Sequence, residues 1–68
     1  MEAWIRIKDN QCFVNKGVLQ PGTKIEITPA PGLWLPGQYG YDSEHQEHYW
    51  KADDEHFVGL IDGMKVRI

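Results

Sequence analysis

Apolar and polar side chains alternate with period two in three segments of the chain, residues 3–8, 24–28 and 64–68. Successive side chains of a β-strand point to opposite faces, so this alternation predicts three strands, each with one buried and one solvated face. In the first segment Trp4, Arg6 and Lys8 are expected on the solvated face. The predicted core combines the apolar members of these runs with two from residues 57–61: Ile5, Ile7, Ile25, Ile27, Val58, Leu60, Val66 and Ile68.

Three sequence signals for tight turns separate the predicted strands. Asp9-Asn10 tolerates positive φ and predicts a hairpin, and Gln20-Pro21-Gly22-Thr23 predicts a turn that uses the proline and the glycine. Asp62-Gly63, flanked by apolar runs, predicts a second hairpin with a type I′ turn.

Two segments lack a clear period. Residues 28–37 contain three prolines, which exclude a helix and leave at most a short edge strand at residues 33–35. Residues 42–57 have too few apolar side chains to line one face of a helix. They are interpreted as a loop, a strand centred on residues 49–51, and a turn through Asp53 and Asp54.

Five or six short strands in 68 residues must share one core and hide their sheet edges. We therefore expect a single all-β domain spanning residues 1–68, either an SH3-like barrel or a rolled antiparallel sheet. An oligonucleotide-binding barrel usually needs a longer chain and ranks second.

Composition narrows the classes of function. The chain is 41% hydrophobic and 25% charged, typical of a folded domain, but a chain of 68 residues leaves little room for a deep catalytic cleft. The single Cys12 cannot form an internal disulfide, which favours a cytoplasmic setting. No signal peptide or membrane span is expected from the sequence.

Residues 17–68 resemble a family of small uncharacterised all-β domains of Gram-positive bacteria, their phages and mobile elements. The resemblance is carried by "GVLQPGTKIEI", "GLWLPGQYGYD" and "YWKADDEHFVGLIDGMKVRI", above all by the Gly-x-Trp-x-Pro step at residues 32–36 and the closing "VGL" and "VRI". It implies a small β-barrel with no assigned chemistry. The segments "TPAPG" and "SEHQEH" depart from the family's plain polar loops.

Residues 41–56 hold all three histidines and six of the ten acids. His45, His48 and His56 with a nearby carboxylate are ligand types of a zinc or nickel site. However, residues three apart in a strand point to opposite faces, so we expect solvated histidines with no metal and no cofactor.

No catalytic residue is expected either. Cys12 lies in an apolar strand, where a cysteine usually acts as a small buried hydrophobe. Asp53, Asp54 and Glu55 are adjacent in an exposed turn, where nothing raises the pKa of one of them for acid catalysis.

Aromatic side chains are the most informative group for binding, because three Trp and three Tyr exceed what so small a core requires. About half could fill the ends of a barrel, and the others could form an exposed groove edged by acids. Adjacent strand residues face opposite sides, so one of Tyr49 and Trp50 is expected in the core, and Trp50 is placed outside as the anchor. The predicted binding residues are Trp34, Tyr39, Tyr41, Asp42, Glu44, Trp50, Asp53 and Asp54.

The leading hypothesis is a non-catalytic module that binds a proline-rich or basic peptide of another protein. An alternative is an acidic decoy from a phage or mobile element, since residues 42–56 hold six acids against one lysine. Another is weak nucleic-acid binding if the terminal strands pair and present one basic, aromatic face, which the acidic residues 42–56 oppose. That face would consist of Trp4, Arg6, Lys8, Lys65 and Arg67.

Overall fold

Eight β-strands form the fold in the computed structural model, which describes residues 1–15 and 17–68 and contains no helix in them. The strands are β1 (Glu2–Lys8), β2 (Gln11–Val14), β3 (Gly17–Val18), β4 (Lys24–Ala30), β5 (Leu33–Asp42), β6 (Glu47–Asp53), β7 (His56–Gly59) and β8 (Lys65–Arg67). The all-β prediction is confirmed, but the expected number of five or six strands was wrong. Strands of two to four residues give too short an alternation to be recognised from sequence.

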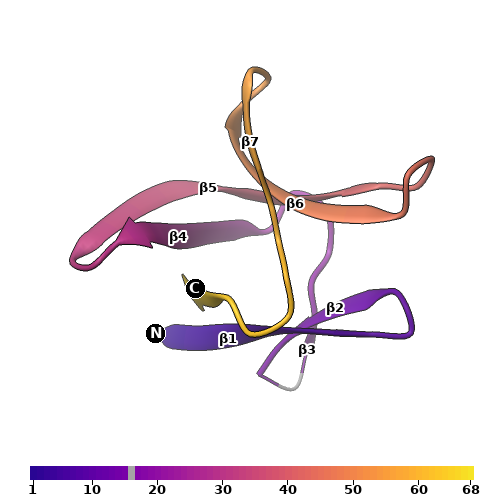
Figure 1. Cartoon of the computed structure of the whole chain (residues 1–68), viewed down its shortest axis with the longest axis horizontal. Coiled ribbons are helices and arrows are strands. Elements are labelled where there is room, and N and C mark those ends of the chain that lie inside the picture. Colours follow the sequence, from indigo (N-terminus) through magenta and orange to yellow (C-terminus); the bar gives the residue numbers. More distant parts are fainter. Residues whose placement is uncertain (16) are drawn as a thin grey trace.

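One antiparallel sheet with the strand order β3-β2-β1-β8-β4-β5-β6-β7 curls into a half-barrel. Figure 1 shows β4 and β5 on one side of the molecule and β1 and β2 on the other, with the C-terminal strand between them. Although β8 has three residues, it pairs with both β1 and β4, through Trp4↔Lys65 and Ile27↔Val66 among others. The two terminal strands therefore lie side by side in the middle of the sheet.

The core lies on the concave face of the sheet and follows the predicted alternation. Its buried members are Ala3, Ile5, Cys12, Val14, Leu19, Ile25, Ile27, Tyr39, Trp50, Leu60 and Val66, with Ile7, Tyr41 and Met64 packed against them. The prediction was wrong for Val58 and Ile68, which are 37% and 46% exposed. Val58 belongs to the last strand of the sheet, and Ile68 follows the end of β8, so neither is covered by neighbouring strands.

Two of the three predicted turns form as expected. Asp9 and Asn10 have φ of 51° and 59° and join β1 to β2, which confirms the hairpin. The N–H of Thr23 donates to the carbonyl of Gln20 at 3.0 Å, and Gly22 has a φ of 93°, which confirms the turn at residues 20–23.

The third turn exists but does not make a hairpin. The N–H of Met64 donates to the carbonyl of Ile61 at 3.1 Å around Asp62 and Gly63, yet β7 pairs with β6 while β8 pairs with β1 and β4. Gly63 has a φ of 90° and Asp62 has no positive φ, which is the pattern of a type II turn. The carboxylate of Asp62 instead accepts the N–H of Ile7 at 2.9 Å, which joins the turn to β1.

The segment rich in proline is longer as a strand than predicted. It forms the tips of β4 and β5, and β5 runs for ten residues. Pro36 pairs with Glu26 of β4, but the pairing of β5 with β6 begins only at Gln38, so one side of β5 is a sheet edge at Pro36. A proline, which has no N–H to donate, is tolerated at such an edge. The interpretation of residues 42–57 as loop, strand and turn is confirmed by β6 and the turns at its ends. Within the described residues, no helix is long and apolar enough to cross a membrane.

Candidate functional site

The eight predicted binding residues do not form one surface. Tyr39 and Trp50 lie in the core, and Trp34 lies at the far end of β5 beside Arg67. The rest divide between the two ends of β6: Tyr41, Asp42 and Glu44 lie near the turn that joins β5 to β6, and Asp53 and Asp54 lie at the turn that joins β6 to β7.

Trp50 is not an exposed anchor. It is 3% exposed, and its indole N–H donates to the backbone carbonyl of Ile25 at 3.2 Å. Its ring also takes the space beside Gly37, where an added Cβ would lie 2.3 Å from Nε1. Trp50 pairs with Tyr39 across the strands, and both side chains point inward. The predicted orientation of the Tyr49 and Trp50 pair was therefore reversed, and Tyr49 is the ring on the outer face.

Tyr49 forms the floor of an open hollow of about 590 Å³. Its ring lies over its cross-strand partner Gly40, where an added Cβ would lie 2.3 Å from the ring. Phe57 from β7 packs against Tyr49 edge to face, with ring centroids 5.5 Å apart. We call this hollow the aromatic-acidic groove, and its lining residues are Tyr41, Asp42, Ser43, Glu44, Glu47, Tyr49, Phe57 and Gly59.

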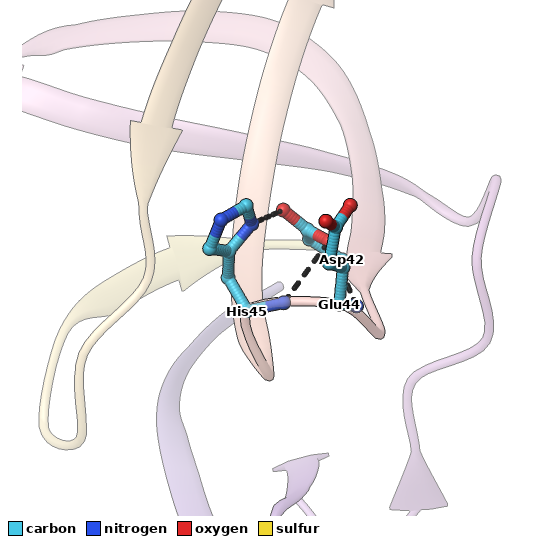
Figure 2. Close-up of side chains that lie close together, drawn as sticks. All are labelled: Asp42, Glu44 and His45. Atoms are coloured by element: carbon cyan, nitrogen blue, oxygen red, sulfur yellow. Dashed lines mark hydrogen bonds and ion pairs between the residues drawn. The ribbon is translucent and has the colours of Figure 1, made fainter.

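Asp42 is fixed at one end of this groove by its own turn. Its Oδ1 accepts the backbone N–H groups of Glu44 and His45 at 3.0 and 3.3 Å, and its Oδ2 contacts Nδ1 of His45 at 2.8 Å (Figure 2). The hydrogen bond from His45 is the main cause that lowers the pKa of Asp42, and the same bond raises the pKa of His45. Asp42 is therefore a held, ionised carboxylate.

The same turn is built again at the other end of β6. Oδ1 of Asp53 accepts the N–H groups of Glu55 and His56 at 2.8 and 3.0 Å and contacts Nδ1 of His56 at 2.8 Å. Backbone hydrogen bonding, led by Glu55, lowers the pKa of Asp53. This repeat was not predicted, although the pattern Asp-x-Glu-His occurs at residues 42–45 and again at 53–56. Such side chain to backbone bonds explain why these acids and histidines occupy turns.

The three histidines are separated by these turns. His45 and His56 each pair with an aspartate of their own turn, at opposite ends of β6, whereas His48 is buried. The expectation of solvated histidines was therefore wrong for His48. Asp42, Glu44 and His45 alone place one ligand atom each within 4.8 Å of one another in the described residues. A metal would have to displace the contact between Asp42 and His45. The absence of a metal site stays a prediction.

His48 lies 7% exposed between two tyrosine rings, with ring centroids 5.9 Å from Tyr39 and 4.8 Å from Tyr41. Its Nδ1 contacts the hydroxyl of Tyr39 at 2.6 Å, and its Nε2 has no hydrogen-bond partner among the residues described. Burial lowers the pKa of His48 against the opposing effect of the Asn10 carbonyl. The imidazole is therefore neutral near pH 7.

Cys12, in contrast, has the properties expected from the sequence. It is buried, and burial raises the pKa of its thiol to about 11. A thiol that stays protonated at neutral pH is a poor nucleophile, which agrees with a structural role.

A second aromatic surface lies on the outer face of the middle strands. Trp4 is 55% exposed and pairs with Lys65, and the guanidinium of Arg67 lies 4.3 Å from the ring centroid of Trp34. The two cations are already paired with acids, Lys65 with Glu2 at 2.7 Å and Arg67 with Glu26 at 3.8 Å. This pairing reduces the positive charge that the face offers to a ligand.

Comparison with known proteins adds no relative: no protein-family model, curated protein or solved structure matches this chain.

Proposed function

We propose that this protein is a non-catalytic interaction module whose aromatic-acidic groove binds a basic segment of another protein. The observation that carries the proposal is the presence of two ring faces, Tyr49 and Phe57, beside the carboxylates of Asp42, Glu44 and Glu47 in one open hollow. Phe57 is 53% exposed, a high value for a phenyl ring in a strand.

The chemistry of this groove fits a Lys or Arg side chain. Three acids and no lysine or arginine occur among the described residues that line it, so the groove attracts cations. Aromatic faces bind a cation through their quadrupole, and the carboxylates can bind the same group through charged hydrogen bonds. Neutral peptides would gain the aromatic contact without the charge.

The same geometry argues against catalysis. Acid catalysis at neutral pH needs a carboxyl whose pKa is raised by burial, whereas the pKa of Asp42 is lowered and the side chain is held by His45. The hollow is open to solvent on a 68-residue domain, which favours binding of a surface segment over enclosure of a small substrate.

The test is a titration with a synthetic peptide library. Peptides that contain Lys or Arg at varied spacing are compared with matched peptides in which glutamine replaces each basic residue, at low and at high salt. Basic peptides should bind and lose affinity with salt, and Phe57→Ala should weaken binding about tenfold or more without a loss of folding, because it removes an exposed ring. Trp4→Ala is the matched control, since Trp4 is exposed and does not line the groove.

Two outcomes contradict the proposal. One is equal affinity for the basic peptides and for their glutamine counterparts. The other is unchanged binding in Phe57→Ala. An acidic decoy would use the same carboxylates, but it would bind a folded basic groove of a host protein and ignore the isolated peptides.

Nucleic-acid binding is a second candidate, favoured by the pairing of β1 with β8. This pairing brings Trp4 beside Lys65, while the ion pair of Lys65 with Glu2 reduces the positive charge there. Bases can stack on Trp4 while Arg6 and Lys8 meet phosphates. A single-stranded oligonucleotide should then quench tryptophan fluorescence in the protein but not in Trp4→Ala.

We also propose that the fold is an SH3-like barrel, which the curl of the antiparallel sheet and its short strands support. An experimental structure compared with such barrels would test it.

A further inference from the structure

β7 ends the sheet and pairs with β6 on one side, while no other described strand pairs with its opposite edge. The N–H of Leu60 donates to the carbonyl of His48 at 2.9 Å, so the backbone groups of Leu60 point toward β6. In an antiparallel ladder this direction alternates from residue to residue. The N–H and C=O groups of Phe57 and Gly59 therefore point outward from the sheet.

Gly59 has no evident role in folding. Its φ is not positive, and nothing lies within 4 Å of the place that a Cβ would take. Gly40, on the other side of Tyr49, differs because a Cβ there would meet the Tyr49 ring. A glycine weakens a strand unless another group approaches closely. Since Gly59 lines the groove, its open space is where a ligand would approach.

The edge itself is apolar. Folded proteins commonly block a free edge with lysine or proline, and β7, with the sequence His-Phe-Val-Gly, contains neither, although it is only four residues long. All four of its residues are exposed, and Ile61 just beyond it is 65% exposed. A strand added here would bury apolar surface and satisfy the outward backbone groups of Phe57 and Gly59.

The acids near the edge of β7 favour a basic peptide over a second copy of the chain as the partner. Acids lie at both ends of β6, next to this edge: Asp42, Glu44 and Glu47 line the groove, and Asp53, Asp54 and Glu55 form the turn into β7. A second copy of the chain, docked edge to edge, would bring like charges together. A basic peptide would meet opposite charges instead.

We propose that the basic partner segment binds as an added β-strand along the free edge of β7. Its Lys or Arg side chains occupy alternate positions and enter the aromatic-acidic groove over Gly59, and apolar side chains between them face Val58. This inference rests on the proposed function and specifies how the same groove is used. It belongs to the recognition mode in which main-chain hydrogen bonds supply affinity and alternate side chains supply specificity.

Backbone methylation of a bound peptide tests the strand addition. In the tightest basic peptide of the library, each amide nitrogen is methylated in turn. Methylation of a residue whose N–H points at β7 should lower the affinity of the peptide about tenfold, because one hydrogen bond is lost. Methylation of the neighbouring residues should change the affinity little. The expected result is an alternating pattern of loss along the peptide.

A substitution in the protein supplies the second arm. Gly59→Val should keep or raise the melting temperature, because a β-branched residue favours a strand, and it should weaken peptide binding by filling the open space. Gly17→Val, the same substitution in β3 at the opposite edge of the sheet, is the control and should leave peptide binding unchanged.

The outcomes separate this inference from the function on which it rests. If basic peptides bind but methylation shows no alternation and Gly59→Val binds normally, strand addition is wrong and the groove binds side chains alone. If no basic peptide binds, the proposed function itself fails. If the free protein forms dimers that Gly59→Val abolishes, the edge takes a second copy, which also overturns the inference.

Discussion

The indole N–H of Trp50 donates to the backbone carbonyl of Ile25, at 3.2 Å, and so connects β6 to β4 across the intervening β5. The ring can cross under β5 because Gly37 leaves the necessary space. A side chain that satisfies its one polar atom in this way is a structural element of the core.

Removing this ring should unfold much of the protein. Truncation of a buried tryptophan costs about 3–5 kcal/mol, comparable with the whole stability of a small domain. We expect Trp50→Ala to be largely unfolded in urea titrations in which Trp4→Ala, the exposed control, behaves as the wild type. Tyr49→Ala should lie between them, because its ring is partly solvated. A Trp50→Ala protein with the wild-type midpoint would contradict this account.

Gly37→Ala should be more damaging than its size suggests. A Cβ at this position would lie 2.3 Å from Nε1 of Trp50 and 2.4 Å from the backbone carbonyl oxygen of Lys51, and the backbone cannot move aside easily. We expect a loss of about 1–3 kcal/mol in the free energy of unfolding, typical of overpacking. Gly17→Ala is the control, since its nearest atom would be 3.9 Å away, and equal losses in the two variants would refute the steric argument.

His48 and His45 should titrate on opposite sides of the ordinary histidine value of 6.5. Burial lowers the pKa of His48, so the unfolded chain binds a proton first as pH falls. The stability due to neutral His48 is therefore present above pH 6.5 and is lost as pH falls toward the folded pKa. The pKa of His45 is raised by Asp42, so its stabilisation is full below 6.5 and is lost as pH rises through the folded pKa.

NMR titration of the imidazole resonances measures both values directly. Urea unfolding at about pH 5 and about pH 8 should show less acid sensitivity in His48→Gln than in the wild type, and His45→Gln should not share this effect. A His48 resonance that titrates above that of His45 would contradict the assignment.

Zinc or nickel at neutral pH should raise the melting temperature by no more than about one degree. His48 is buried, His45 contacts Asp42, and His56 contacts Asp53, so we expect no three-histidine site in the folded domain. A clear shift that disappears in His45→Ala and persists in His56→Ala would place a metal at Asp42, Glu44 and His45.

The sequence predicts the parts of the fold in which one face is apolar. In β1 the alternation of Ile5 with Arg6 is sufficient, because a shift of one residue would expose the whole apolar set. In β6 the alternation does not identify the buried face, because Tyr49 and Trp50 are both aromatic and the other buried residue, His48, is polar. The missing information was in β5, where Gly37 and Gly40 provide space for the two rings.

The partners of short strands could not be predicted either. Asp62-Gly63 has the local chemistry of a hairpin, but Val66 pairs with Ala3 and Ile27, which are distant in sequence. Burial of Val66 between them outweighs the local preference of the turn. Of the eight predicted binding residues only Tyr41, Asp42 and Glu44 line the groove, because its rings, Tyr49 and Phe57, depend on the register of β6 and β7.

The position of β8 in the middle of the sheet also determines the timing of folding. Three residues near one end of the chain must find β1 near the other end before the two halves of the sheet share a core. Closing so long a loop costs conformational entropy before any contact compensates for it, and β-rich chains with distant pairings fold in about milliseconds to seconds. During that interval the core residues Ala3 and Ile27, which pair with Val66 in the folded sheet, remain exposed. The pairing of β8 with β1 thus sets how long the folding chain is vulnerable to aggregation.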